Sequence, residues 1–128
     1  MRRYLFLIVF IIFSVTGWAK GKDGYVVATS EAVRADAAWM KVVDALVKKH
    51  KADVIFYKEN IGELQKPLRQ LRPRFVAFVE KPEFLNREYV MEGHRMSRRV
   101  DEDIYADYLW GIITGFSAED AMRLVDRS

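Results

Sequence analysis

Four short runs rich in β-branched and aromatic residues alternate with segments of helical periodicity, and this alternation constrains the fold more than any other feature. The runs span residues 25–30, 53–57, 75–79 and 108–113. Each has the length of a strand, and the third, Phe75–Val79, is apolar throughout, as is typical of a strand buried on both faces. Strands that alternate with helices favour a parallel sheet covered by helices. We therefore expect an α/β fold: an open, doubly wound, mostly parallel sheet of about four strands with helices on both faces.

The segments between these runs carry the helical patterns. Apolar residues recur at helical spacing over residues 36–50, 64–71 and 86–99, and Ser117 is placed to cap a last helix, with Asp120 three residues further on. Pro67 opens or kinks the second helix, and Pro73 ends it. The resulting order is β-α-β-α-β-α-β-α, which is typical of flavodoxin-like layering.

The first 19 residues have the pattern of a secretory signal peptide. Arg2 and Arg3 precede the unbroken apolar run Tyr4–Phe13, and small residues stand at Gly17 and Ala19. The apolar stretch is shorter than the roughly 20 residues that span a bilayer, so a membrane anchor is the weaker alternative. We expect cleavage after Ala19, a single domain over residues 20–128, and an exported protein, periplasmic or extracellular, without a membrane partner after cleavage.

Charge and cysteine content narrow the function classes. The chain carries 21 basic and 18 acidic residues, and removal of residues 1–19 takes away two arginines and no acid, which leaves a net charge of +1. Such a balance argues against nucleic acid as a partner, because phosphate binding calls for a clear excess of Lys and Arg. The absence of cysteine excludes disulfides, zinc-thiolate sites and a cysteine nucleophile.

Polar residues at the predicted strand ends are the candidate ligand-binding residues. In open α/β sheets ligands bind beyond the carboxyl ends of the strands. Thr29, Ser30, Glu80 and Thr114 fall at those ends. We predict that Thr29, Ser30 and Thr114 face a ligand or a protein or peptide partner, whose identity the sequence leaves open.

An acidic segment provides the candidate metal ligands Asp101, Asp103 and Asp107. Calcium, which prefers several oxygen ligands, is the ion that this set suits. The helix-loop-helix calcium motif is excluded, because Ala106 stands where it needs glycine and Ile112 where it needs glutamate. The alternative is that the acids are solvated beside the arginines that precede them. No other cofactor is expected, since the glycines form no phosphate-binding motif.

No complete catalytic set is evident. His50 and His94 are the two histidines, and each lies in a predicted helix among charged residues. The nucleophile motif Gly-x-Ser-x-Gly is absent, and Ser30 and Ser117 are explained as a strand-end residue and a helix cap. The sequence therefore predicts no enzymatic activity of its own.

Two segments resemble the front part of the gingipain-like cysteine peptidases. These are LRPRFVAFV (71–79) and VDEDIYADYLWGIITGFSAEDAMRLVDR (100–127), where Asp103, Tyr105, Ala106 and Asp107 carry most of the similarity. The resemblance implies a caspase-like α/β domain of exported bacterial proteins, in agreement with the signal peptide and the alternating pattern.

The departures from that family's pattern bear on activity. Thr114-Gly115 stands where the family's strand usually ends in Gly-Arg. The family's catalytic histidine and cysteine would follow the region that matches, and the chain holds no cysteine. We therefore expect either the front part of a larger peptidase-like domain or a non-catalytic descendant. The alternative is a small cell-envelope binding or interaction module.

Overall fold

The structure, a computed structural model, describes residues 24–99 and 107–128. The predicted signal peptide lies outside the described residues. The strands are β1 (Tyr25–Ser30), β2 (Asp53–Tyr57), β3 (Phe75–Val79) and β4 (Leu109–Ile113). The α-helices are α1 (Glu31–Arg34), α2 (Ala37–His50), α3 (Gln65–Leu71), α4 (Arg87–Ser97) and α5 (Ala118–Arg127), and two 3₁₀ helices are η2 (Ile61–Leu64) and η3 (Pro82–Phe84).

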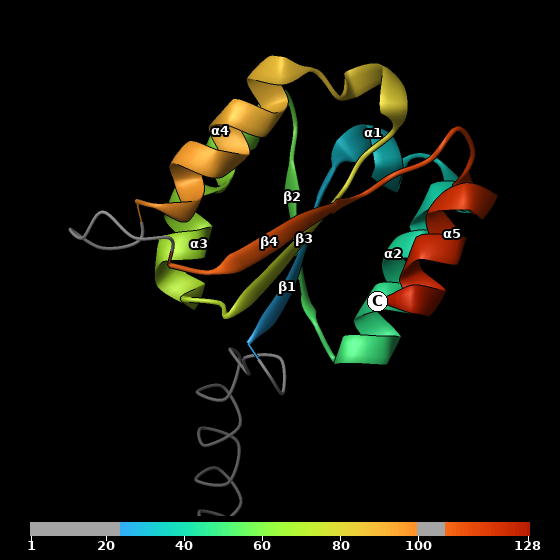
Figure 1. Cartoon of the computed structure of the whole chain (residues 1–128), viewed down its shortest axis with the longest axis horizontal. Helices are drawn as coiled ribbons and strands as arrows, with labels where there is room; N and C mark the ends of the chain where they lie inside the picture. Colours follow the sequence, from blue (N-terminus) through green and yellow to red (C-terminus); the bar gives the residue numbers. More distant parts are fainter. Residues whose placement is uncertain (1–23, 100–106) are drawn as a thin grey trace, which may run out of the picture.

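The four strands form one open sheet in the order β2-β1-β3-β4, and every neighbouring pair is parallel. This confirms the predicted α/β fold. Helices lie on both sides of the sheet: α3 and α4 cover one face, and α2 and α5 cover the other (Figure 1). Because the strands are parallel, all four carboxyl ends meet at the same edge of the sheet.

Each face of the sheet has its own hydrophobic core, because side chains alternate between the faces along every strand. Val26, Ala28, Val76 and Phe78 face η2, α3 and α4, whereas Val27, Ala77 and Val79 face α2 and α5. β3 is buried from Val76 to Val79, as its uniformly apolar sequence predicts. Burial of both faces explains why the sheet needs helices on each side.

Side-chain caps set where the helices begin. Asp36 accepts hydrogen bonds from the backbone N–H groups of Ala38 and Trp39 at the start of α2, and the Ser117 hydroxyl accepts one from Asp120 at the start of α5. The predicted cap at Ser117 is thereby confirmed. The third predicted helix and the fourth predicted strand are shorter than expected: α4 begins after its cap Asn86 and ends at Ser97 instead of Arg99, and β4 begins one residue after Tyr108.

The apolar stretch around residues 64–71 is divided between η2 and α3. Pro67 is the third residue of α3, within the first turn, where its missing N–H group removes no hydrogen bond of the helix. The proline is therefore compatible with the opening of this helix, one of the two alternatives that the sequence allowed.

Candidate functional site

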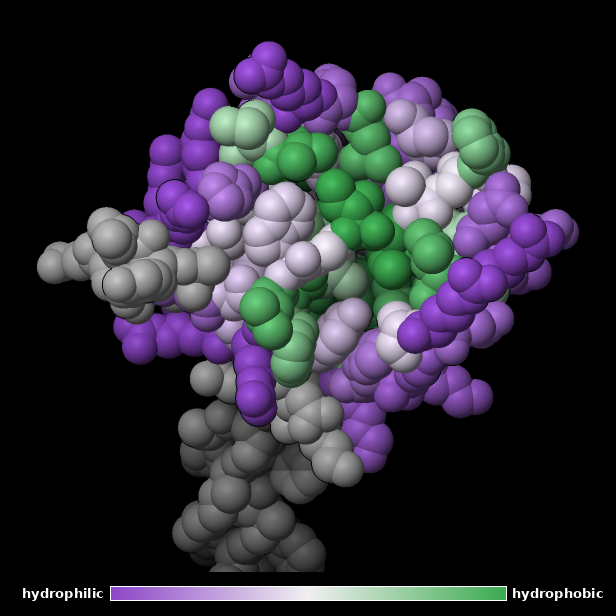
Figure 2. Space-filling model, in the orientation of Figure 1, coloured by the Kyte–Doolittle hydropathy of each residue, from purple (hydrophilic) through white to green (hydrophobic). Residues whose placement is uncertain are grey.

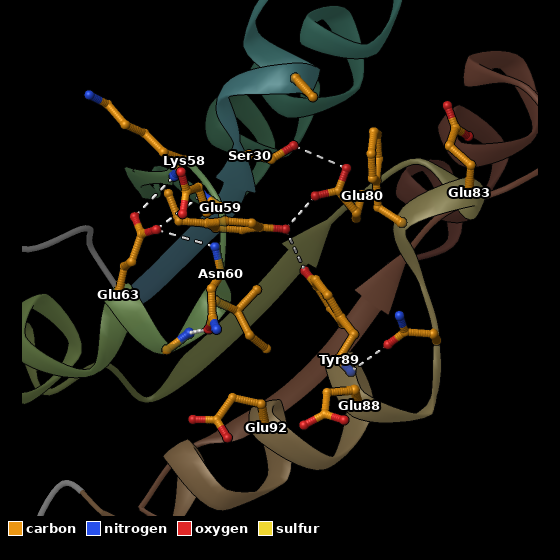
Figure 3. Close-up of a pocket in the computed structure, with 16 residues that line it drawn as sticks. Ser30, Lys58, Glu59, Asn60, Glu63, Glu80, Glu83, Glu88, Tyr89 and Glu92 are labelled. Carbon is orange, nitrogen blue, oxygen red and sulfur yellow. Dashed lines mark hydrogen bonds between the residues drawn. The ribbon is translucent and has the colours of Figure 1, made fainter.

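A pocket of about 770 Å³ opens at the carboxyl ends of β1, β2 and β3. Its walls are the β2–η2 loop, η2, η3 and α4, and the last residues of the strands lie at its base (Figure 3). The pocket lies beside the ends of the neighbouring strands β1 and β3, where the strand order reverses. β2 lies on one side of β1, whereas β3 and β4 lie on the other. Such a reversal of strand order is where α/β proteins hold their ligands.

The base of the pocket is the carboxylate of Glu80, the residue that follows β3. Its side chain is 1% exposed. Oε1 accepts hydrogen bonds from the Ser30 hydroxyl at 3.0 Å and the Lys81 backbone N–H at 2.9 Å, and Oε2 accepts one from the Tyr57 hydroxyl. Three donors from the described part of the chain therefore surround the carboxylate, whose oxygens accept from each of them. A buried carboxylate is tolerated only with such donors.

The ammonium group of Lys81 points elsewhere. It forms an ion pair of 2.9 Å with Asp36, the cap of α2, and this hydrogen bond lowers the pKa of the Asp36 carboxyl. The bond from Lys81 to Glu80 therefore comes from its backbone N–H and not from its ammonium group. The donors that contact the Glu80 carboxylate are two hydroxyls and one N–H, all of them neutral.

Two tyrosines link Glu80 to the wall of the pocket. The hydroxyls of Tyr57, at the end of β2, and Tyr89, on α4, are 3.1 Å apart. Because the proton of Tyr57 is directed at Glu80, Tyr89 is the donor of this second bond. Burial raises the pKa of Tyr57 above its usual value of 10.0, Tyr89 and Glu80 raise it further, and burial also raises the pKa of Tyr89. Both phenols therefore remain neutral donors in ordinary buffers.

The rim of the pocket is acidic. Six glutamates and one lysine are among the residues that line it: Glu59, Glu63, Glu80, Glu83, Glu88, Glu92 and Lys58. Figure 3 shows the labelled glutamates distributed around the opening on several elements. The pocket therefore has a strongly negative electrostatic potential, which the low-dielectric walls concentrate.

The rim glutamates differ in how they are held. The Glu63 carboxylate accepts hydrogen bonds from the backbone N–H groups of Lys58, Glu59 and Asn60, and the first two bonds in particular lower its pKa. Glu92 forms an ion pair of 3.1 Å with Arg95 on the outer surface of α4. These contacts fix two of the charges in position before any ligand binds.

The three predicted ligand-binding residues occupy different environments. Ser30 lines the pocket, donates to Glu80 and caps the short helix α1 through the N–H of Val33. Thr29 is fully buried, and its hydroxyl donates to the carbonyl oxygen of Val79 at 2.7 Å, which ties β1 to β3. Thr114 follows β4, and its hydroxyl oxygen is buried without a hydrogen-bond partner among the described residues. Of the three, Ser30 is the one that lies in the pocket.

The predicted calcium ligands lie largely outside the described residues, which omit Asp101 and Asp103. Asp107 is described, and its backbone N–H donates to the carbonyl oxygen of Ser97 at 2.6 Å. Within residues 24–99 and 107–128, no group of three or more His, Asp or Glu side chains is arranged to hold a metal ion. The calcium site stays a prediction.

Neither histidine lines the pocket. His50, at the end of α2, stacks on the ring of Tyr25 with the ring centroids 4.2 Å apart, at the opposite end of the sheet. His94 is exposed on α4. The Ser30 hydroxyl contacts a carboxylate, so the serine-histidine arrangement of nucleophilic catalysis is not formed at this residue.

Sequence reasoning placed Glu80 at a strand end and did not assign it to the site, and it did not single out Tyr57 or Tyr89. The sequence did contain a signal for Glu80, because an acid that directly follows a uniformly apolar strand lies next to the buried end of that strand. Glu88 and Glu92 are four residues apart, which places both on one face of a helix. The contacts of Glu80 and Tyr89 with Tyr57 depend on the strand order, which the sequence does not show.

Comparisons with known proteins yield no match. No protein-family model, curated protein or solved structure matches this chain. Within the described ranges, no helix combines the length and apolar character needed to cross a membrane. Fold and pocket geometry are thus the observations from which a function is inferred.

Proposed function

We propose that this protein is an exported, non-catalytic binding module whose strand-end pocket takes a small organic ligand with several amine groups. The observation that carries the proposal is the lining of the pocket, in which five glutamates and one lysine surround the buried carboxylate of Glu80. A cationic ligand is favoured there because its charge complements the potential of the pocket.

The distribution of the glutamates supports an extended organic cation. They come from the β2–η2 loop, η2, the end of β3, η3 and α4, so the carboxylates ring the opening (Figure 3). A calcium site needs several oxygens at 2.3–2.6 Å from one point. An amine chain with separated charged groups can instead contact carboxylates on opposite walls through charge-assisted hydrogen bonds.

Aromatic side chains supply the apolar part of the same pocket. Tyr57, Tyr89 and Phe84 all line it, and Phe84 is 49% exposed. Aromatic faces attract ammonium groups, and the methylene segments of an amine chain gain from contact with them. Contact with the methylene segments of such a ligand explains why Phe84 is exposed at the rim of the pocket.

The proposed relationship to gingipain-like peptidases is supported by sequence similarity alone. Asp103, Tyr105 and Ala106, which carry most of the resemblance, lie outside the described residues. The chain has no cysteine, so peptidase chemistry of that family would lack its nucleophile here. A binding role agrees with both the resemblance and the pocket.

Isothermal titration calorimetry of the exported protein with spermidine tests the proposal, and calcium chloride is titrated in parallel. We expect spermidine to bind and the affinity to fall as salt is added, because the contacts are ionic and largely exposed. The variant Glu59→Gln/Glu88→Gln should bind about tenfold more weakly, since two partly exposed ion pairs are each worth up to about 1 kcal/mol.

Glu119→Gln is the matched control, because Glu119 is an exposed glutamate on α5 that does not line the pocket. Its affinity for spermidine should equal that of the unmodified protein. Undetectable binding of spermidine, or equal weakening by the control, would contradict the proposal. Calcium binding that the pocket variant abolishes would contradict it too and would indicate a metal site.

A further inference from the structure

We propose that β4 pairs with β4 of a second copy of this chain, in antiparallel orientation about a two-fold axis at Gly111, to form one continuous eight-stranded sheet. This inference is independent of the ligand proposed above. It rests on the outer edge of β4, which pairs with no other strand of the described part of the chain, on the exposure of Leu109 and on the strand's lack of charge.

Among the strands of residues 24–99 and 107–128, β4 pairs with β3 alone, so it lies at the edge of the described sheet. The Leu109 N–H donates to Arg74 and the Ile113 carbonyl accepts from Glu80, so these residues direct their backbone groups toward β3 and its flanks. Gly111 is two residues from each of them, so its N–H and C=O groups also point toward β3. Trp110 and Ile112, between them, therefore direct their N–H and C=O groups to the outer edge, where a further strand can bond them.

The face of β4 beside this edge is apolar and open. Leu109 is 68% exposed, and a methyl group added at Gly111 would meet no atom within 4 Å. A groove of about 260 Å³ runs over this region between Tyr25, Phe75 and β4, and no charged residue lines it. Figure 2 shows hydrophobic residues gathered over β4 and toward α5, with hydrophilic residues around them.

The two edges of the sheet differ in how they are protected. β2, at the other edge, begins with Asp53, and the guanidinium of Arg34 lies over the ring of Phe56, 4.7 Å from its centroid. Charged groups of this kind discourage pairing of edge strands. β4 has none of these devices, since residues 108–117 include no charged residue and no proline.

A second copy is the occupant that this edge fits, because the strand is complementary to itself. With the axis at Gly111, Leu109 lies opposite Ile113 of the other copy in a non-hydrogen-bonded pair. Trp110 lies opposite Ile112, and each of the two Trp110–Ile112 pairs can exchange two hydrogen bonds. The first charged residue on this register, Asp107, lies opposite Gly115. No like charges meet, and the two apolar grooves become continuous across the axis.

A single introduced cysteine tests both the association and its register, because the chain has none of its own. The two Gly111 residues would form a non-hydrogen-bonded pair with Cα atoms about 4.5 Å apart, within the range that a disulfide spans. We expect Gly111→Cys to give a disulfide-linked dimer on mild oxidation. Leu124→Cys, at a partly exposed position of α5, is the matched control and should stay largely unlinked.

Sedimentation of the exported protein at increasing concentration is the second measurement. We expect a monomer–dimer equilibrium that Leu109→Lys weakens by about tenfold or more, since two apolar contacts are lost per dimer, while Leu124→Lys leaves it unchanged. A protein that stays monomeric at millimolar concentration overturns the proposal. So does a dimer that Leu109→Lys leaves intact, or cross-linking that is equal at positions 111 and 124.

Discussion

The hydroxyl of Tyr57, at the end of β2, donates a hydrogen bond to the carboxylate of Glu80, at the end of β3, although β1 lies between these strands in the sheet. Ser30, at the end of β1, donates to the same carboxylate. One buried acid therefore joins the ends of three strands. This arrangement gives the pocket a base whose carboxylate is buried and held by hydrogen bonds from the ends of β1 and β2.

Removal of the Tyr57 hydroxyl should destabilise the protein. Tyr57→Phe leaves one oxygen of the buried Glu80 carboxylate without its donor, and hydrogen bonds to charged groups contribute about 1.5–3 kcal/mol. We expect a loss of that size in the free energy of unfolding, measured by urea denaturation. Tyr89→Phe is the matched control: Tyr89 is half-buried and its hydroxyl bonds the neutral hydroxyl of Tyr57, so the loss should be about 1 kcal/mol or less. Equal losses of unfolding free energy in the two variants would show that the hydrogen bond to Glu80 contributes no more than the bond between the two tyrosines.

Alkaline pH should destabilise the fold through the buried tyrosines. Burial raises the pKa of Tyr57, Tyr89 and Tyr108 above the usual 10.0, so the folded state holds their protons where the unfolded state releases them. Their contribution to stability is present below about pH 10 and declines as pH rises further, because unfolding then releases protons.

The measurement is urea denaturation at a series of pH values from about 8 to 11, with tyrosine ionisation followed by ultraviolet absorbance. Lysines titrate in the same range, so the informative comparison is with Tyr57→Phe. That variant should lose less stability between these limits than the unmodified protein, since one of the shifted groups is gone. Parallel pH profiles for the two proteins would exclude Tyr57 as a source of the effect.

Two threonines at strand ends should respond oppositely to the same substitution. Thr29→Val removes a buried donor to the Val79 carbonyl and should cost about 1 kcal/mol of unfolding free energy. Thr114→Val removes a buried hydroxyl that has no partner among the described residues, so the variant should be as stable as the unmodified protein or more stable. Thermal and urea unfolding distinguish the two. A loss at position 114 equal to that at position 29 would show that the Thr114 hydroxyl is bonded in solution.

The fold was predictable because its signals are local. The uniformly apolar run Phe75–Val79 and the helical spacing of Trp39, Val43 and Leu46 each specify an element from a few neighbouring residues. The caps at Asp36 and Ser117 mark helix starts in the same way. Alternation of strands with helices then implied the parallel sheet, since a crossover helix returns the chain to the same end.

The candidate site was predictable only in outline. General experience with parallel sheets pointed to the strand ends, and Ser30 was found there. The pairing of Ser30 with Glu80 spans 50 residues of sequence, and that of Tyr57 with Tyr89 spans 32. Separations of this size leave no periodic trace, so Tyr57 and Tyr89 were not identified from the sequence.

Periodicity by itself determined which residues are buried and which segments are strands, because burial of an amphipathic segment depends on the segment's own pattern. It could not determine which strands become neighbours. Only the tertiary structure, with the order β2-β1-β3-β4, places Tyr57, Ser30 and Glu80 together and puts β4 at the edge of the sheet that the described residues form. Strand order is decided by the packing of helices on both faces, and it is this order that creates the acidic pocket.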